Sequence, residues 1–298
     1  MASQRMSTER EPELDVVLPA GGRIPAEFAA AVGTDVKTLI EIRGRTVLEH
    51  VLSVLRASER IGRLVVVAAK EVADHPAARL ADAVVPEGAS GADNCLRGLD
   101  WLREQSGGRT SGRVLICTTD LPLLTTQAVE SFLDACPPEA GACGSVMERR
   151  DFEAAFPGFV KTFVPLRDGA FRMGGAFLID PEPIERARVQ FERVFTGRKQ
   201  HLVMARLLGP SFLLRFVLRR LTVADVQRRC EAILGCRAYV WPQCPPELAL
   251  DIDHLKDYRY ALTLIRSQGR PDGSPKCHPP AGPDSAPPRR PTHWEVRS

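Results

Sequence analysis

Short apolar runs alternate with amphipathic stretches over most of the chain. The runs are rich in β-branched residues and have the length of buried strands, at residues 14–18, 64–69, 83–86 and 114–118. Stretches with helical spacing lie between or after them, at residues 47–55, 92–103 and 125–135. Strands that alternate with helices are typical of βαβ units, so the pattern predicts a mainly parallel sheet covered by helices on both faces.

The stretch 47–55 carries the most complete helix signal. Thr46 and Glu49 have the spacing of a capping box at its start. Apolar residues then recur at helical spacing, at Val47, Leu48, Val51, Leu52 and Leu55. This arrangement indicates a helix whose apolar face packs against the sheet.

The order of elements changes after Gly141. Residues 159–165 and 175–180 have the composition of strands, and strand-like sequence returns at 236–241. A last helix is expected at 254–265. The second half of the chain is therefore expected to complete the same sheet.

A long helical stretch, residues 181–235, separates two of these strands. It contains a helical segment at 211–220 and a helix that is expected to start at Thr222 and to end at Gly235, a common C-cap residue. Because strand-like sequence resumes after it, we interpret the stretch as a helical insertion in one domain that spans residues 13–265.

The two ends of the chain have a different character. Residues 1–12 are polar, and residues 266–298 hold eight of the 24 prolines, so we expect a flexible arm and a disordered tail. The net charge of +3 lies in the tail, which contains six Lys and Arg residues and three Asp and Glu residues. The body is neutral, which argues against a nucleic-acid polymer as partner.

The apolar runs and the cysteines indicate the cellular compartment of the protein. No apolar run approaches the length of a membrane span, and the first residues lack the apolar core of a secretory signal, so we expect a cytoplasmic protein without membrane contacts. The eight cysteines contain no C-x-x-C pair. We therefore expect reduced thiols and neither disulfides nor a structural zinc site.

The first candidate for chemistry is the segment VVLPAGGRIP, residues 16–25. Gly21 and Gly22 follow a predicted strand, and Arg23 stands directly behind them. Glycines allow a backbone to approach a ligand closely, and the arginine adds a cation, which suits an anionic ligand. An ordinary turn uses the same residues. The dinucleotide fingerprint G-x-G-x-x-G and the Walker pattern are both absent, which argues against a dehydrogenase or a P-loop ATPase.

Two further candidates are Lys37 and Asp120. Lys37 precedes a short apolar run and could reach back to the glycine loop, although most lysines at such positions are solvated. Asp120 follows the strand VLICTT. In open parallel sheets ligands bind at the carboxyl ends of strands, where a carboxylate can hold Mg²⁺. A local turn or cap is the alternative for Asp120.

Two acidic stretches complete the set. Asp251 and Asp253 precede the last helix, and on an extended chain their side chains would point to opposite sides. We expect one of them to bind a metal and the other to cap the helix. In the loop GASGADN, residues 88–94, Asp93 or Asn94 is expected to be an N-cap, although the loop could also pass over a base or ribose.

The order of these features, a glycine loop with arginine, a lysine, a strand-end aspartate and a distal aspartate pair, resembles one family. The chain is similar to nucleotidyltransferases of the GT-A-like superfamily, in particular NTP transferases similar to molybdenum-cofactor guanylyltransferase (MobA-like). The resemblance runs from about residue 15 to 265. It is strongest in LPAGGR, in residues 37–50, in TTDLPLLT and in DIDHLKDY.

This resemblance implies a three-layer α/β/α fold of Rossmann-like, GT-A-like type and an enzyme. The implied reaction is the Mg²⁺-dependent transfer of a nucleoside monophosphate from an NTP to a small phosphorylated or hydroxyl acceptor, with release of pyrophosphate. The implied catalytic residues are Arg23, Lys37 and Asp120, and Mg²⁺ would be held by Asp120 with Asp251 or Asp253. The implied nucleotide-binding residues are Leu18, Ala20, Gly21, Gly22, Arg23, Lys37, Ser90 and Asn94.

Two other functions remain open. A GT-A-type glycosyltransferase that uses a nucleotide-sugar also carries a D-x-D motif, although here Asp251-Ile-Asp253 precedes the terminal helix. A catalytically inactive nucleotide-binding module is favoured by the short glycine loop and by Ala176, where the resemblance leads us to expect a polar residue.

The helical insertion leaves two questions. Gly197-Arg198-Lys199 could face an anionic acceptor or could be a solvated helix end. The apolar segment SFLLRFVLRR, residues 211–220, could form an acceptor lid or the surface of a homodimer, while core packing is the commoner explanation for such a stripe.

Overall fold

The computed structural model describes residues 14–108, 112–197 and 209–268. Within them one mixed sheet of eight strands has the order β10-β7-β9-β6-β1-β4-β5, with β8 paired to β9. The strands are β1 (Leu14–Pro19), β4 (Ile61–Ala68), β5 (Ala83–Pro86), β6 (Val114–Cys117), β7 (Ala142–Glu148), β8 (Val164–Leu166), β9 (Gly169–Ile179) and β10 (Ala238–Trp241). A small hairpin joins β2 (Glu41–Ile42) and β3 (Arg45–Thr46).

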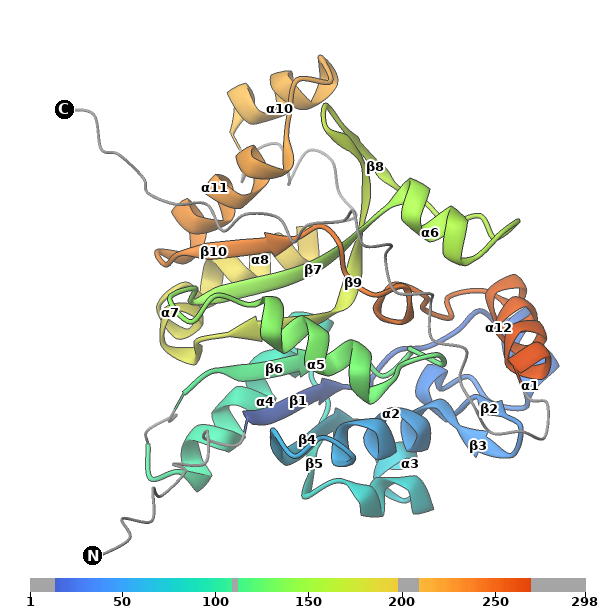
Figure 1. Ribbon diagram of the computed structural model, residues 1–298. Helices are drawn as coiled ribbons and strands as arrows, with labels where there is room; N and C mark the ends of the chain where they lie inside the picture. Colours follow the sequence, from blue (N-terminus) through green and yellow to red (C-terminus); the bar gives the residue numbers. More distant parts are fainter. Residues whose placement is uncertain (1–13, 109–111, 198–208, 269–298) are drawn as a thin grey trace, which may run out of the picture.

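Helices cover both faces of this sheet (Figure 1). One face packs against α2 (Val47–Arg56) and α5 (Thr126–Ala135), and the other against α4 (Gly91–Gln105). Alternate residues of β1 point into the two cores, so Val16 and Leu18 belong to the first and Val17 to the second. The predicted three-layer α/β/α class with a mainly parallel mixed sheet is confirmed.

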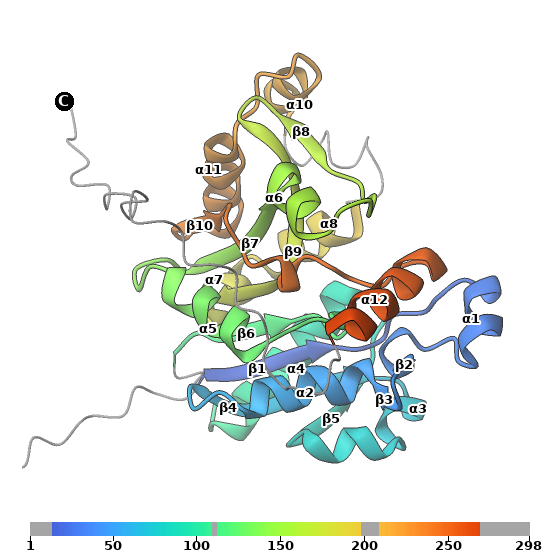
Figure 2. The ribbon, with the colours of Figure 1, turned by 45° about the vertical axis from the view of Figure 1, so that its right-hand side comes forward.

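Some of the remaining helices cover the same face of the sheet as α4, because Ile184, Phe191 and Leu234 pack in its core. The insertion between β9 and β10 holds α7 (Pro181–Arg186), α8 (Arg188–Gly197), α10 (Pro210–Val217) and α11 (Val223–Leu234). The others are α1 (Ala26–Val32), α3 (Lys70–Ala73), α6 (Arg149–Ala155) and α12 (Leu255–Gln268), with 3₁₀ turns at Lys37–Leu39, Pro76–Leu80 and Pro246–Leu248. Figure 2 shows α10 and β8 at the far end of the molecule from α3.

Local signals explain two helix boundaries. The Thr46 side chain accepts a hydrogen bond from the N–H of Glu49, and the five predicted apolar residues of α2 are all buried. At α11 the predicted start is confirmed by a full capping box between Thr222 and Asp225. Gly235 ends that helix in the left-handed conformation, with φ of 67°.

The second half of the sheet differs from the sequence prediction. The sequence pattern did not reveal β7, and β9 begins at Gly169, six residues before the predicted strand start. β9 runs antiparallel to both β6 and β7. Positions 174 and 175 within β9 require glycine. A Cβ at Gly174 would lie 2.4 Å from Oγ of Ser145, and a Cβ at Gly175 would lie 2.5 Å from Oγ1 of Thr118.

The strand predicted at 159–165 is wrong except for its last two residues. The ring of Phe152 packs against those of Phe156, Phe159 and Phe163 at centroid distances of 5.0–5.9 Å. Phe159 stacks in turn on Tyr260 of α12. Phe159 and Phe163 are buried by aromatic packing against neighbouring helices and not by strand pairing.

Two predictions about the ends and the insertion need comment. Residues 266–268, expected to begin a disordered tail, form the last turn of α12. The predicted arm 1–12, the rest of the tail, and Arg198 and Lys199 lie outside the described residues. Core packing does not explain SFLLRFVLRR, because Leu214, Val217 and Leu218 are exposed. Its function as a lid or dimer surface stays a prediction.

The parallel part of the sheet positions the loops of interest. β1, β4, β5 and β6 run in the same direction, so their carboxyl ends meet at one edge. The loops that follow β1, β5 and β6 carry Gly21, Glu87 and Asp120. Among the described helices none combines the length and the apolar character that crossing a membrane requires.

Candidate functional site

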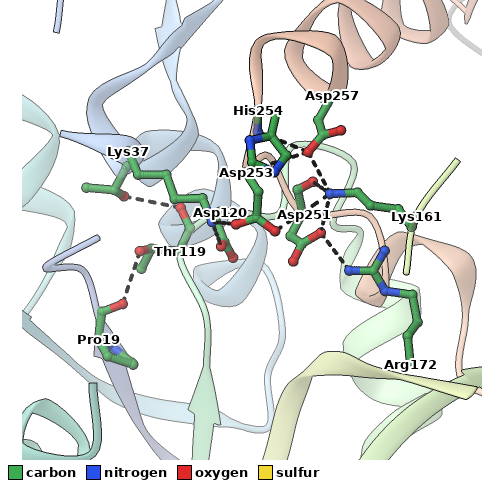
Figure 3. A network of polar contacts seen from close by, with 11 residues as sticks. Pro19, Lys37, Thr119, Asp120, Lys161, Arg172, Asp251, Asp253, His254 and Asp257 are labelled. Atoms are coloured by element: carbon green, nitrogen blue, oxygen red, sulfur yellow. Dashed lines mark hydrogen bonds and ion pairs between the residues drawn. The ribbon is translucent and has the colours of Figure 1, made fainter. Parts of the chain in front are cut away.

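Two threonines hold the loops at this edge together. Thr119, two residues after the end of β6, donates a hydrogen bond from its hydroxyl to the carbonyl of Pro19 at the end of β1, at 3.2 Å. Thr38 donates in turn to the carbonyl of Thr119, also at 3.2 Å. Both side chains are buried, so the 3₁₀ turn of Lys37 is fixed against the ends of β1 and β6 (Figure 3).

The glycine loop is packed between this frame and the loop after β5. The carbonyl of Gly22 accepts a hydrogen bond of 2.9 Å from the N–H of Lys37. A Cβ on Gly21 would lie 2.1 Å from Oε2 of Glu87 and 2.8 Å from Nδ2 of Asn94. Gly21 is therefore needed for close approach, whereas a Cβ on Gly22 would make an ordinary contact of 3.4 Å with Cδ of Lys37.

The Lys37 ammonium joins two of the predicted acidic residues. Its Nζ lies 2.5 Å from Oδ2 of Asp120 and 2.6 Å from Oδ1 of Asp253. The side chain is only 14% exposed. Burial alone would lower the pKa of Lys37, but the two carboxylates outweigh burial and hold the pKa above its usual value. Lys37 is thus charged at neutral pH and lies between two carboxylates.

Three carboxylates could hold a metal ion. Asp120, Asp251 and Asp253 each offer an oxygen, and these atoms all lie within 4.8 Å of one another. Oδ1 of Asp120 is buried and has no hydrogen-bond partner among the described residues. Hard carboxylate oxygens, one of them unpartnered, form a donor set that suits Mg²⁺. The residues present therefore fit the metal that the sequence analysis predicts.

The two distal aspartates have different surroundings. Oδ1 of Asp251 lies 2.9 Å from Nζ of Lys161 and 2.8 Å from Nη2 of Arg172. Burial works to raise the pKa of Asp253, but Lys37 above all, and also Lys161, keeps it at about 2. Asp253 is therefore ionised at neutral pH.

The prediction that Asp251 or Asp253 caps the last helix is wrong. Oδ2 of Asp257, in the first turn of α12, accepts the N–H groups of Asp253 and His254 at 3.0 and 3.1 Å. The predicted divergence of Asp251 and Asp253 is wrong as well, because residues 251–253 do not form a strand. Both therefore reach the same cluster.

The loop after β5 also differs from prediction. The N-cap of α4 is Ser90, whose Oγ accepts the N–H of Asp93 at 3.1 Å, and not Asp93 or Asn94. Oδ1 of Asn94 accepts the N–H of Gly88 at 2.7 Å. This bond leaves the Nδ2 group of Asn94 beside Gly21.

Four other predicted positions can be placed. Arg23 does not contact the carboxylate cluster; its guanidinium lies 3.6–4.0 Å from Asp35, Glu71 and Glu87. The side chains of Leu18 and Ala20 are in the hydrophobic core, so only their backbone is available to a ligand. Ala176 is also a core residue, so its lack of a polar group leaves the carboxylate cluster unchanged.

Sequence reasoning missed Glu87, Lys161, Arg172 and Asp257. Glu87 stands at the carboxyl end of a predicted strand, which is the signal that selected Asp120. Asp257 is the last acidic residue of DIDHLKD, a segment that carries the family resemblance, and this could have drawn attention to it. Lys161 and Arg172 have no local signal, because their partners lie about 80 to 90 residues further along the chain.

Glycine loop, lysine and strand-end aspartate thus meet at one edge of an α/β sheet. The family model of the MobA-like NTP transferase domain matches residues 17–224 of the chain. The chain belongs to the MobA-like NTP transferase family. The match includes Gly21, Gly22, Lys37 and Asp120, and it ends before Asp251 and Asp253.

Solved structures agree with this family. The structure of a hypothetical transferase from Thermus thermophilus is 31% identical, covers 82% of this chain and 99% of its own, and has a TM-score of 0.70. A 4-diphosphocytidyl-2C-methyl-D-erythritol synthase from Anaerococcus prevotii is 15% identical over 86% of this chain and 96% of its own, with a TM-score of 0.54. The latter likeness shows the fold alone. No curated protein matches the chain significantly.

Membership in the MobA-like family identifies the chain as an enzyme, a transferase whose domain acts on nucleoside triphosphates. The recognition of this family from the sequence is confirmed. The family does not by itself decide which nucleotide or acceptor this chain uses.

Proposed function

We propose that the protein is a Mg²⁺-dependent nucleotidyltransferase. It transfers a nucleoside monophosphate from an NTP to a small phosphorylated or hydroxyl acceptor and releases pyrophosphate. The observation that carries the proposal is the contact of Lys37 with Asp120 and Asp253, directly beside the glycine loop. A cation, metal-binding carboxylates and free backbone at the carboxyl edge of a parallel sheet are the groups that a triphosphate requires.

The glycine loop and two basic side chains bind the triphosphate in this proposal. Backbone N–H groups of Gly21 and Gly22 approach the phosphate oxygens. Lys37 and Arg23 neutralise the β- and γ-phosphates, which leave as pyrophosphate. The ion pairs of Arg23 are long and its side chain is 37% exposed, so it can turn toward a phosphate at little cost.

Asp120 and Asp253 would hold Mg²⁺, with Asp251 behind them. When bound, the ion supplies positive charge to the α- and β-phosphate oxygens, where negative charge builds up during transfer. Asn94 lies beside Gly21, and in this proposal its loop, which includes Ser90, contacts the base or ribose.

The transfer itself needs no protein nucleophile. An oxygen of the acceptor forms a bond to the α-phosphorus while the bond from that phosphorus to the bridging oxygen breaks, and pyrophosphate leaves with the electron pair. A hydroxyl acceptor releases its proton to solvent, and a phosphate acceptor has none to lose. The protein contributes positioning and electrostatic stabilisation.

The experiment that tests this function measures thermal unfolding of the protein with each of the four NTPs, with and without Mg²⁺. A ligand at 100 times its Kd is expected to raise the melting temperature by about 5–10 °C. We expect one NTP to give a Mg²⁺-dependent rise in wild type and in Asp134→Asn, a control with an exposed side chain on α5. In Asp120→Asn the rise should be much smaller.

The same assay separates the other candidate functions. A rise with nucleotide-sugars but with no NTP would overturn the proposal in favour of a glycosyltransferase. NTP binding without pyrophosphate release against any acceptor would favour an inactive module. Transfer by Asp120→Asn as fast as by wild type would remove the proposed metal site.

We also propose a cytoplasmic location and a possible homodimer. None of the seven described cysteines forms a disulfide, which is consistent with a reducing compartment. The exposed apolar side chains of α10 are the surface on which a dimer would form. Sedimentation of the purified protein at several concentrations tests the assembly.

A further inference from the structure

Lys37 contacts two of the three carboxylates that could hold a metal ion, Asp120 and Asp253. Its ammonium lies 2.5 and 2.6 Å from single oxygens of Asp120 and Asp253, so it is in direct contact with both carboxylates. A metal ion held by Oδ2 of Asp120 and Oδ1 of Asp253 would compete with the Lys37 ammonium for these two oxygens, while Oδ1 of Asp120 remains open as a further ligand (Figure 3). Cation and ammonium cannot both occupy this position.

The surrounding charges match this competition. The cluster contains the carboxylates of Asp120, Asp251, Asp253 and Asp257 and the cations Lys37, Lys161 and Arg172. With all of them in place the net charge is −1. Withdrawal of Lys37 leaves a net charge of −2, which one divalent ion neutralises.

The other two cations are not free to leave. Lys161 is only 7% exposed and bonds the buried Asp257 at 2.6 Å as well as Asp251. Arg172 bonds Asp251 and lies over the ring of Phe152, with its Cζ 5.4 Å from the centroid. Lys37 is therefore the cation of this cluster that a metal ion would displace.

The Lys37 side chain also lies next to a second position for its ammonium, at the glycine loop. Its backbone N–H is bonded to the carbonyl of Gly22, and its Cδ lies beside the Gly22 Cα, where a Cβ would be 3.4 Å away. The side chain therefore lies along the loop whose N–H groups are proposed to bind phosphates. A rotation of its terminal bonds moves the ammonium from the carboxylates to that loop without moving the backbone.

We propose that Lys37 occupies the metal position between Asp120 and Asp253 in the nucleotide-free protein and is displaced onto the phosphates when metal and nucleotide bind. This inference rests on the proposed function. It makes the binding of metal and nucleotide interdependent, because the phosphates accept the ammonium that the metal displaces. Metal alone binds weakly, since nothing then receives Lys37.

The test measures Mn²⁺ binding to the nucleotide-free protein by electron paramagnetic resonance, with Mn²⁺ as the only probe. We expect Lys37→Met to bind Mn²⁺ at least about ten-fold more tightly than wild type. Lys70→Met removes the same charge from an exposed side chain and should leave the affinity within about two-fold of wild type. The double variant Lys37→Met/Asp120→Asn should lose the gain.

Lys37→Gln repeats the test with a polar side chain, and melting curves establish that each variant is folded. Equal Mn²⁺ affinity of wild type and both folded Lys37 variants would overturn the inference, as would a gain that survives Asp120→Asn. Neither result depends on turnover. The proposed function fails separately, if Asp120→Asn transfers nucleotide as fast as wild type.

Discussion

At the scale of single residues, the site depends on contacts between groups far apart in the sequence. Asp120 could be predicted because it follows the carboxyl end of a predicted strand, where ligands bind in parallel sheets, and Lys37 because it could reach back to the glycine loop. Their mutual contact could not be predicted, since it spans 83 residues. Lys161 was missed for the same physical reason: nothing in its neighbourhood shows that it is buried against Asp257.

Gly21→Ala tests the close approach of the glycine loop. The new Cβ would collide with Nδ2 of Asn94, which is buried and tied to Gly88, and with the carboxylate of Glu87. We expect the Kd for the NTP to rise about ten-fold or more, by isothermal titration. Gly22→Ala is the control, because its Cβ has room beside Lys37. Equal losses in both variants would contradict the account.

Lys161→Met tests the buried ion pair behind the site. Asp257 is fully buried, so removal of its ammonium partner leaves a buried carboxylate without compensation. We expect the free energy of unfolding to fall by about 3–5 kcal/mol, measured by urea denaturation. Lys256→Met changes an exposed residue of α12, the helix that carries Asp257. It should alter the free energy of unfolding by less than about 0.5 kcal/mol. A loss for Lys161→Met no larger than for the control would show that the pair is not important for stability.

At the scale of elements, alternation of strand and helix predicted the first half of the sheet well. Predictions failed where pairing or packing is decided at long range. β7 reads A-C-G-S-V-M-E, a run without a strong strand signal, and it is stabilised by β9 and β10 on its two sides. Phe159 and Phe163 looked like strand residues because aromatic residues favour strands, yet they belong to a cluster of rings.

The attachment of α2 to the loop after β6 makes stability depend on pH. Nε2 of His50 donates to the carbonyl of Leu124 at 2.9 Å, since a carbonyl can only accept. Burial lowers the pKa of His50 below its usual 6.5. The unfolded chain therefore binds a proton more readily, and stability is lost as the pH falls below about 6.5.

His50→Gln should reduce this loss, because glutamine can donate to Leu124 without titrating. Urea denaturation of wild type and variant between about pH 8 and 5.5 measures the difference. We expect the wild-type free energy of unfolding to fall more steeply as the pH decreases. Parallel curves over this range would show that His50 is not responsible.

At the scale of the whole molecule, the fold class followed from the sequence because periodicity and connection order constrain an α/β sheet strongly. The family followed from local motifs at the loops that this sheet aligns. The placement of the C-terminal segment beside Asp120 was implied by the family resemblance and could not be predicted from the local pattern alone. Ile252 donates its N–H to the carbonyl of Asp120, which brings Asp253 to the ends of β1 and β6. Only the folded chain shows that Asp120 and Asp253 share one cation.

The central claim is that a metal and a triphosphate bind where Lys37, Asp120 and the glycine loop meet. A crystal structure with Mn²⁺ and the α,β-methylene analogue of the NTP that most stabilises the protein tests it most directly. The account predicts an anomalous peak at about 2.1 Å from oxygens of Asp120 and Asp253, with the Lys37 ammonium on the phosphates. A nucleotide away from Gly21 and Gly22, or a metal that does not touch Asp120, would contradict it.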